Sequence, residues 1–222
     1  MPDSKNYIPA LKYDWLTRIY DPVLQLTMPE RKFKNALINQ MNVQANDKVL
    51  DFGCGSLTLS IMAALKHSHA EFYGVDIDEK ILSIAKKKVT GVGLTIEAKL
   101  YDGGRLPYPD NFFDKVMSSL VFQHLTLRQK YSALKEIFRV LKPSGTVNIA
   151  DFAKPANVLQ RTGFYTIQLL DGFETTQDSV KNVLPATLRE TGFPKVDEVG
   201  VFKTMVGTVR IFSAQKPNQS IL

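Results

Sequence analysis

The sequence predicts an α/β fold in which a seven-stranded, mostly parallel sheet carries helices on both faces. Three observations support this prediction. From Lys48 onward, apolar runs typical of buried strands alternate with amphipathic helical patterns, as they do when helices join parallel strands. The run Lys48–Ser56 passes from apolar residues through an acid into two glycines one residue apart. Late in the chain, two strand patterns are separated only by Thr204–Val206, which predicts an antiparallel pair and an antiparallel last strand.

The segment before the sheet, residues 1–46, is expected to form a helical cap. Residues 1–9 are polar and contain proline, so we expect a loosely held arm. Ala10–Val43 carries two or three helical segments, broken near Pro22 and Pro29. The aromatic residues that lie close together here are Tyr13, Trp15 and Tyr20. These rings either cap a pocket or bury against the sheet, and the sequence favours neither interpretation.

The core, residues 47–153, is predicted to alternate strands and helices. The predicted strands are Lys48–Phe52, Glu71–Asp76, Thr95–Tyr101, Lys115–Ser119 and Thr146–Asp151. The glycine turn leads into a helix over Leu57–Lys66, whose first free N–H groups face the gap beyond the strand. Asp78 can cap a second helix, and Thr126 precedes a third helix that Lys142–Gly145 ends. We assign the second and third helices to packing and give them no chemistry.

The remainder, residues 154–216, changes character. Asn157–Leu170 predicts an unusually apolar helix, followed by a loop over Asp171–Asp178. This helix is a candidate lid over a small or apolar molecule, or an interface through which a homodimer forms. Pro185–Thr191 predicts a short helix with proline in its first turn and Gly192 just beyond its end. Strands are expected over Lys195–Lys203 and Gly207–Gln215.

The composition is that of one globular domain spanning residues 1–222. Hydrophobic residues make up 44% and charged residues 23%, and no repeat or low-complexity segment divides the chain. No apolar run approaches the roughly 20 residues that span a bilayer. Met1–Ala10 lacks the pattern of a signal peptide, so we expect a cytoplasmic protein with no membrane span. The single cysteine, Cys54, excludes an intrachain disulfide and a cysteine-rich metal site.

The net charge of +6 permits contact with nucleic acid or an anionic membrane. The densest basic run, Lys86–Lys88, ends a predicted helix, where cations complement the helix dipole. A solvated helix end is therefore the simpler interpretation. The sequence contains no added RNA-binding module and no basic tract interleaved with aromatic residues. We therefore expect a small-molecule substrate and no nucleic-acid partner.

The glycine turn at Gly53 and Gly55 marks the candidate binding site. Glycine lets the backbone turn sharply and leaves no Cβ in the way of a ligand. A strand that leads through a glycine turn into a helix N-terminus is the nucleotide-binding corner of an open α/β sheet. Two glycines also occur in tight turns for steric reasons alone. Cys54 between them is more typical of a small-residue requirement than of a nucleophile.

Two further loops supply matching parts of such a corner. The second strand ends at Asp76, where a carboxylate can accept hydrogen bonds from ribose hydroxyls. Ile77 beside it could lie against a purine face. The alternative role of Asp76, a helix cap, is one that Asp78 is already placed to fill. After the third strand, Asp102 and the bare backbone of Gly103 can reach an adenine edge, although ordinary turn formation explains these glycines equally well.

Taken together, these stretches resemble the class I S-adenosylmethionine-dependent methyltransferases. The resemblance is strongest to the methyltransferase type 11 branch, which includes the ubiquinone and menaquinone biosynthesis C-methyltransferases. Four signatures occur in the order typical of the family: V-L-D-F-G-C-G, G-V-D-I-D, Y-D-G-G-R-L-P-Y-P-D-N-F-F-D and R-V-L-K-P-S-G. The resemblance covers Lys48–Asp151 well and extends loosely to Lys216. It implies a Rossmann-like fold and S-adenosylmethionine as the cofactor.

The resemblance also implies roles for individual residues. The implied cofactor contacts are Asp51, Gly53, Cys54, Gly55 and Ser56 for the methionine part, Asp76 for the ribose, Asp102 and Gly103 for the adenine, and Ser119 beside the cofactor. The pairs Tyr13-Asp14 and Tyr20-Asp21 are similar to the cap segment of this branch. No metal is implied.

Two positions depart from the family pattern. Ser144 stands where a glycine is usual, in a turn away from the cofactor, and Leu57 stands where a third glycine is usual. In one alternative interpretation, Leu57 closes the pocket, and the chain is a catalytically weak or inactive methyltransferase-fold protein that acts as a binding or regulatory partner. A second alternative, a nicotinamide dehydrogenase, would need a glycine at Thr58 to complete its G-x-G-x-x-G fingerprint.

The chemistry implied by the resemblance is methyl transfer to a small, apolar or aromatic acceptor by in-line displacement. The sulfonium methyl is already reactive, so proximity and orientation can provide most of the lowering of the barrier. A general base is needed only if the attacking atom carries a proton, and His124, just beyond the fourth strand, is the candidate. The alternative is a histidine that opens a helix and is bonded to the backbone. Tyr20 could instead gate or orient the acceptor.

Overall fold

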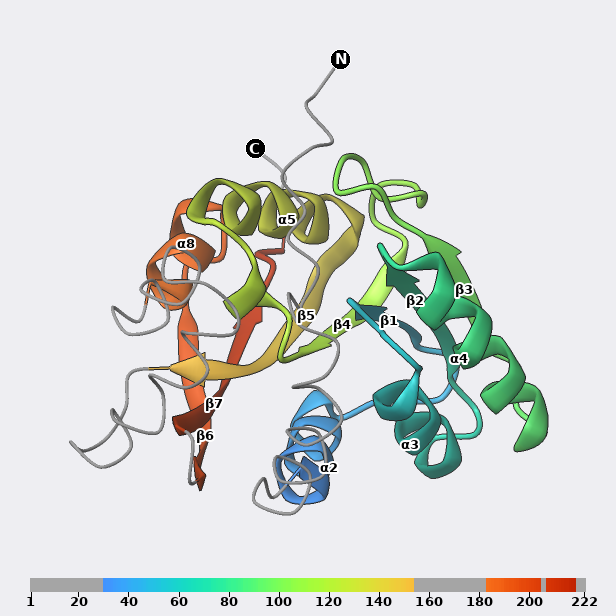
Figure 1. Cartoon of the computed structure of the whole chain (residues 1–222). Coiled ribbons are helices and arrows are strands. Elements are labelled where there is room, and N and C mark those ends of the chain that lie inside the picture. Colours follow the sequence, from blue (N-terminus) through green and yellow to red (C-terminus); the bar gives the residue numbers. More distant parts are fainter. Residues whose placement is uncertain (1–29, 154–182, 205–206, 219–222) are drawn as a thin grey trace.

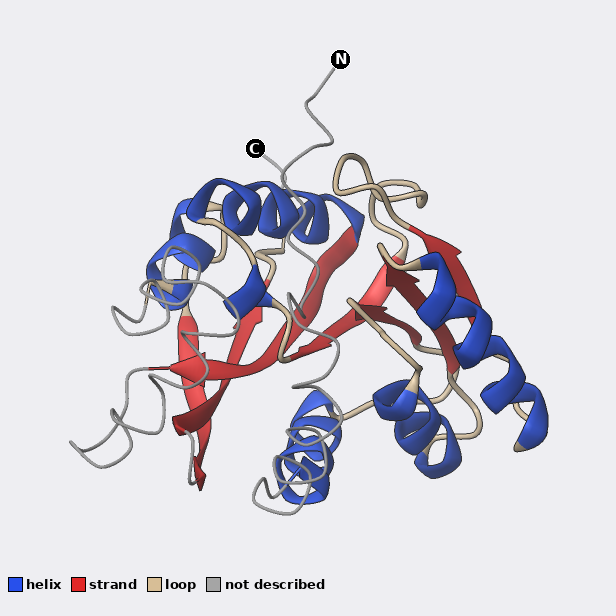
Figure 2. Ribbon diagram, viewed as in Figure 1, coloured by secondary structure: helices blue, strands red, loops and turns tan. Residues whose placement is uncertain are grey.

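The computed structural model describes residues 30–153, 183–204 and 207–218 (Figure 1). Strands and helices alternate through most of these ranges (Figure 2), which confirms the predicted α/β class. The elements are α2 (Glu30–Met41), β1 (Lys48–Phe52), α3 (Thr58–Lys66), β2 (Glu71–Asp76), α4 (Glu79–Gly91), β3 (Glu97–Leu100), β4 (Phe113–Ser119), η2 (Phe122–His124), α5 (Leu127–Val140), β5 (Leu141–Ala153), α8 (Leu184–Glu190), β6 (Val196–Thr204) and β7 (Gly207–Gln215).

Some predicted features lie outside the described residues. They are the cap segment before Glu30, with Tyr20, and the apolar helix over Asn157–Leu170 with the loop that follows it. Among the helices that the structure does describe, none combines the length and the apolar character needed to cross a bilayer.

All seven strands form one sheet in the order β3-β2-β1-β4-β5-β7-β6. β1 runs parallel to its two neighbours, β2 and β4, whereas β7 runs antiparallel to both β5 and β6. The mostly parallel sheet with an antiparallel last strand is therefore confirmed. The strand order reverses between β1 and β4, because the chain first builds outward to β3 and then returns to the other side of β1. Ligands of open α/β sheets bind beyond the carboxyl ends of the strands at such a reversal.

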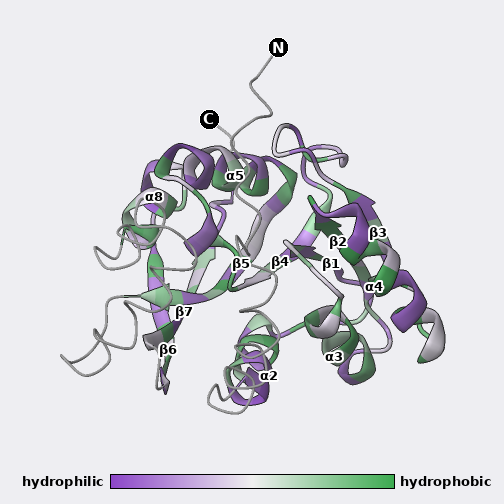
Figure 3. Cartoon of the chain, viewed as in Figure 1, coloured by the Kyte–Doolittle hydropathy of each residue, from purple (hydrophilic) through white to green (hydrophobic). Residues whose placement is uncertain are grey.

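Helices cover both faces of the sheet because successive strand side chains point to opposite faces. Val49 packs into a cluster that α2 and α3 cover, whereas its neighbour Leu50 packs into a cluster that α5 and α8 cover. α4 and α3 share a third cluster. In Figure 1, α5 and α8 lie together on one side of the sheet, and α2, α3 and α4 on the other. Figure 3 shows hydrophilic and hydrophobic segments on both α4 and α5, as expected for helices that bury one face.

Local sequence signals determine where two of the helices begin. Asp78 accepts hydrogen bonds from the N–H groups of Lys80 and Ile81, which confirms it as the cap of α4. Thr126 caps α5 in a capping box with Gln129. Both caps satisfy backbone donors that would otherwise remain without a partner at the helix start.

β5 begins earlier than predicted. The prediction placed a break over Lys142–Gly145, but β5 already starts at Leu141. The Ser144 N–H donates to the Lys216 carbonyl at 3.1 Å, and the Lys216 N–H donates to the Gly145 carbonyl at 2.9 Å. These hydrogen bonds to the residue after β7 draw a proline- and glycine-containing segment into the sheet.

α5 holds the loop after β3 through charged side chains. The Arg139 guanidinium donates to the carboxylates of Glu136 and Asp110, each at 2.7 Å. It also donates to two loop carbonyls, those of Leu106 at 3.1 Å and Tyr108 at 2.9 Å. Glu136 in turn accepts the Leu106 N–H at 2.8 Å. Because the Arg139 and Glu136 side chains are only 17% and 20% exposed, this network fixes the loop between β3 and β4.

Replacing Arg139 with alanine is expected to destabilise the fold by about 2–4 kcal/mol, because Glu136 and two loop carbonyls lose their partner. In a chain of this size, thermal unfolding should show a melting temperature lower by roughly 5–15 °C. Arg128→Ala is the matched control, since Arg128 is an exposed arginine on the first turn of α5. It should shift the melting temperature by less than about 2 °C. Equal shifts for the two variants would contradict the role of the network.

Candidate functional site

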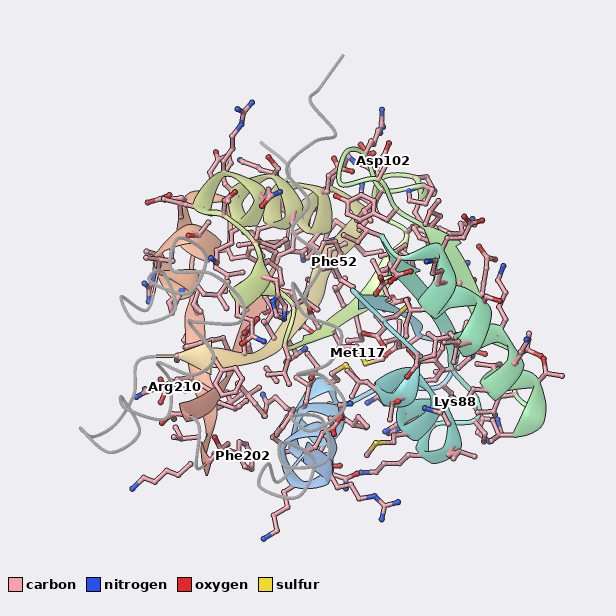
Figure 4. All side chains as sticks on the ribbon, viewed as in Figure 1. Phe52, Lys88, Asp102, Met117, Phe202 and Arg210 are labelled. Atoms are coloured by element: carbon pink, nitrogen blue, oxygen red, sulfur yellow. The ribbon has the colours of Figure 1, made fainter. Side chains whose placement is uncertain are left out.

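The candidate site lies at the carboxyl ends of β1 to β4, where the strand order reverses. Three acids come from three of these strands: Asp51 lies near the end of β1, Asp76 ends β2 and Asp102 follows β3. Ser119 ends β4. Figure 4 shows Asp102 on the loop beyond β3. The fold thus brings to one edge of the sheet residues that are far apart in the sequence.

The glycine loop after β1 is tied to β2 by its backbone. The N–H groups of Gly53 and Cys54 both donate to the Val75 carbonyl at 2.9 Å. Gly53 and Gly55 have positive φ values of 71° and 50°, which favour glycine. A Cβ at Gly53 would lie 2.5 Å from Cγ2 of Val121, whereas a Cβ at Gly55 would meet no atom within 4 Å. The turn therefore needs glycine at residue 53 for packing, and it presents bare backbone to open space at residue 55.

Asp76 organises the end of this loop. One carboxylate oxygen accepts the Gly55 N–H at 2.7 Å, and the other accepts the Asp78 N–H at 3.0 Å. Asp78 itself caps α4, so the capping role considered for Asp76 falls to Asp78. Each carboxylate oxygen can accept a further hydrogen bond, which leaves Asp76 able to accept ligand hydroxyls. Ile77 next to it is 40% exposed and is available to an apolar ligand face.

Asp51 is a buried acid under the loop. Its side chain accepts the Ser60 hydroxyl of α3 at 2.6 Å. Burial raises the pKa of the Asp51 carboxyl to about 6, although the Ser60 hydrogen bond and the positive charge of Lys34 act in the opposite direction. Sequence reasoning missed Ser60 and Lys34. Two sequence features could have found them: Ser60 is a hydroxyl residue on the helix after the loop, and Lys34 is a lysine among the apolar positions of α2.

Leu57 and Cys54 both turn their side chains into the protein. Leu57 precedes α3 in a left-handed conformation, with φ 59° and ψ 24°. Its side chain is fully buried in the cluster between α3 and α4. Because this side chain points into the core, the structure gives no support to the interpretation in which Leu57 closes the pocket. Cys54 is buried in the same cluster, and burial raises the pKa of its thiol far above the usual range, so Cys54 offers a ligand its backbone rather than a thiolate.

The loops on either side of Asp76 expose further polar groups. Asp102 accepts the Gly104 N–H at 2.9 Å, and Gly103 has a positive φ of 86° with no atom within 4 Å of a Cβ placed there. This geometry is a turn, and it also leaves the peptide of Gly103 uncovered. At the start of α3, the Ser56 hydroxyl lies 3.1 Å from the Thr58 hydroxyl, to which Lys88 of α4 donates at 2.6 Å. Figure 4 labels Lys88 beside α3, where sequence reasoning had not placed it.

On the other side of the loop, η2 carries His124. Asp151 of β5 accepts the N–H groups of Phe122 at 2.6 Å and Gln123 at 3.2 Å, so a buried carboxylate fixes the start of η2. Burial raises the pKa of the Asp151 carboxyl to about 6, against the lowering effect of its backbone hydrogen bonds and of His124. The His124 ring is exposed, and its Nε2 lies 3.1 Å from the Gln123 amide nitrogen. Asp151 was missed because nothing in a strand sequence shows which loop its side chain will hold.

The residues at this corner fit a ligand that joins a nucleoside to an amino-acid chain. The Ser119 hydroxyl is buried and finds no hydrogen-bond partner in the described part of the chain. Asp76 has acceptor capacity left for ribose hydroxyls. The Asp51 carboxylate lies buried beneath the loop, where its negative charge can attract an ammonium group above it. The bare peptide at Gly55 leaves room for a ligand to approach the backbone. The donor and acceptor groups of these residues therefore match such a ligand.

Comparison with known proteins gives a consistent result. A family model for a methyltransferase domain matches residues 50–149. The ubiquinone/menaquinone biosynthesis C-methyltransferase UbiE of Neisseria meningitidis is 30% identical over 185 residues, which cover 75% of each chain. A SAM-dependent methyltransferase from Methanosarcina mazei shares the fold with a TM-score of 0.68 and 21% identity, over 82% of this chain and 98% of that one. A phosphoethanolamine N-methyltransferase from Haemonchus contortus, solved with S-adenosyl-L-methionine, gives a TM-score of 0.66 at 16% identity, over 84% of this chain and 53% of that one.

Proposed function

Since this chain belongs to the class I S-adenosylmethionine-dependent methyltransferases, we propose that it methylates a carbon atom of a small, apolar or aromatic acceptor. Similarity to a ubiquinone/menaquinone C-methyltransferase supports carbon as the attacked atom and an aromatic quinol as the acceptor class. The main support for the cofactor site is the hydrogen bond from the Gly55 N–H to the Asp76 carboxylate. Open space around the Cα of Gly55 leaves room for the cofactor beside this bond.

Each part of the corner has one task in this proposal. The stretch Asp51–Ser56 holds the methionine part of the cofactor, with Cys54 contributing its backbone, and Asp76 accepts the ribose hydroxyls. Asp102 and Gly103 meet the adenine, with Ile77 against its face, and Ser119 lies beside the cofactor. When bound, the cofactor supplies an electrophilic methyl group on its sulfonium. The chain contributes orientation, since holding the two reactants in line removes most of the entropic barrier.

We assign proton removal from the acceptor to His124. Loss of a phenolic proton raises the electron density at the neighbouring ring carbons, which makes them better nucleophiles. The attacking ring carbon would take the methyl group as the sulfur–methyl bond breaks, with S-adenosylhomocysteine as the leaving group. That carbon would then lose its own proton, so that the ring becomes aromatic again. Asp151 holds η2 in place through two N–H groups, so the imidazole is held on a fixed turn. The Gln123 amide donates to Nε2, and the acceptor hydroxyl would replace this donor when the ring takes its proton. A base held in this way is expected to contribute to the rate by general base catalysis. A role for Tyr20 in orienting the acceptor stays a prediction.

A transfer assay tests this function. The protein is incubated with methyl-labelled S-adenosylmethionine and a panel of quinols, phenols and amines of similar size. We expect label to enter a ring carbon of a quinol, which two-dimensional NMR distinguishes from an O-methyl or N-methyl product. If the protein binds the cofactor yet transfers label to none of these acceptors, the proposed acceptor class is wrong. The interpretation as a binding protein would then be favoured.

The pH dependence of cofactor binding provides a test of Asp51. The ionised carboxylate is the form that would attract the cofactor ammonium from beneath the loop, and its pKa in the free protein is about 6, above the ordinary value of 3.8. Binding below that pH must release a proton, so affinity should rise about tenfold between pH 5 and pH 7 and then level off. Titration calorimetry with S-adenosylhomocysteine measures this. Asp51→Asn should remove the dependence, and a variant that keeps it would show that another group is responsible.

A further inference from the structure

Leu57 occupies a backbone conformation that normally favours glycine. Its φ of 59° and ψ of 24° lie in the left-handed region, which costs an ordinary L-residue about 1 kcal/mol or more. The Leu57 backbone is nevertheless tied on both sides. Its N–H donates to the Cys54 carbonyl at 2.9 Å, and its carbonyl accepts the Ile61 N–H at 2.9 Å. Leu57 therefore joins the glycine loop to the first turn of α3, and some other interaction must compensate for its conformation.

The space beside the Leu57 side chain comes from a glycine on the neighbouring strand. Gly74 lies in β2, two residues before Asp76, and pairs in register with Asp51 of β1. A Cβ at Gly74 would lie 2.8 Å from Cδ2 of Leu57 and 2.8 Å from Sγ of Cys54. Carbon atoms do not approach so closely, so a side chain at residue 74 would push both residues outward. Gly74 is the partner that lets the two side chains under the loop turn inward.

We propose that Leu57 and Gly74 form a matched pair in which the leucine is a positioning residue for the cofactor loop. A buried side chain seated against a strand glycine holds the left-handed turn here, where the family pattern relies on a third glycine. This inference rests on the proposed cofactor site and deepens it. Its consequence is that Gly55, two residues before Leu57, keeps its N–H at 2.7 Å from the Asp76 carboxylate because packing holds the turn.

A double-mutant cycle tests the pair. The variants are Leu57→Ala, Gly74→Ala and the double variant, each titrated with S-adenosylhomocysteine. Leu57→Ala removes the side chain that holds the turn, and Gly74→Ala displaces it, so each should raise the Kd about tenfold. In the double variant, the methyl group added at residue 74 takes the space that the leucine side chain has left. The Kd should then be no higher than in the weaker-binding single variant, which is a coupling of about 1.4 kcal/mol.

Two control variants separate positioning from general loss of stability. Leu59 is 3% exposed on α3 but packs into the cluster on α2, so Leu59→Ala loses comparable burial without touching the turn. Gly91 at the end of α4 has no atom within 4 Å of a Cβ placed there, so Gly91→Ala adds a methyl group at no steric cost. Both controls should keep the Kd within about twofold of the wild type, although Leu59→Ala lowers the melting temperature.

The outcomes distinguish this inference from the proposed function. If the single effects multiply to about a hundredfold in the double variant, or if Leu59→Ala weakens binding as much as Leu57→Ala, the positioning role is wrong. If the wild type binds no S-adenosylhomocysteine, the proposed function fails. The melting temperatures of the same variants then still decide whether the pair is coupled, because additive shifts would contradict the matched packing.

Discussion

Asp76→Ala is expected to weaken the binding of S-adenosylhomocysteine by at least about 100-fold. The variant loses an ionised acceptor for the ribose hydroxyls, and hydrogen bonds to a charged group contribute about 1.5–3 kcal/mol each. It also leaves the Gly55 N–H, now 2.7 Å from the carboxylate, without its partner. The loop that must meet the methionine part is then less well held. Titration calorimetry at pH 7.5 gives the two dissociation constants directly.

Asp78→Ala is the matched control for this experiment. Asp78 is an acid two residues away that accepts two N–H groups of α4 and so serves the helix rather than the ligand. Its loss should lower stability by about 1 kcal/mol and leave the Kd within about threefold. If Asp78→Ala weakens binding as much as Asp76→Ala, the two acids share one structural role, and the assignment of Asp76 to the ribose is wrong.

His124→Ala is expected to lower kcat by about 100-fold while the Kd for S-adenosylhomocysteine stays within about twofold. General acid–base groups typically contribute factors of this size or larger. We expect kcat and Kd to respond differently because His124 lies on η2 and not on the glycine loop. The residue of this segment that lies against Gly53 is Val121, just before η2. A quinol assay under saturating cofactor measures kcat, and an acceptor that is already ionised should recover most of the lost rate.

His69→Ala is the control for His124. His69 is an exposed histidine before β2, and its carbonyl, rather than its ring, accepts the Asn46 N–H. Its removal should leave kcat unchanged. If His124→Ala retains full kcat on a protonated quinol, the base lies elsewhere, and Tyr20 becomes the next residue to replace.

Much of the sheet could be predicted because its signals are local. β1, β2 and β7 begin and end where the sequence predicted, since each is an apolar run bounded by an acid, a glycine or a polar residue. β3 is shorter than predicted, at Glu97–Leu100, because it lies at an edge of the sheet and has one neighbour. β5 is longer because its first residue, Leu141, pairs with Phe113 of β4, and its last residues pair with Val209 and Thr208 of β7. Lys216, just after β7, also bonds to the backbone of Ser144 and Gly145, and no local pattern reports these pairings.

The sequence predicted which strand ends form the site, but it did not predict the side-chain contacts between them. The acids at residues 51, 76 and 102 lie at or just beyond the ends of strand patterns, so a parallel sheet places them at one edge. The direction of the Leu57 side chain depends on Gly74 in another strand, and the anchoring of η2 depends on Asp151 in a third. Such contacts join residues whose spacing in the chain carries no signal. They decide whether a recognisable motif binds its ligand.

The most direct measurement of the central claim is a crystal structure of the protein grown with S-adenosylhomocysteine. We predict density for one molecule at the corner formed by β1, β2 and β4. Both ribose hydroxyls should lie within hydrogen-bonding distance of the Asp76 carboxylate. The Leu57 side chain should still be buried beneath the loop. Crystals grown at saturating ligand that show this corner empty, or filled by Leu57, would contradict the assignment of the cofactor site.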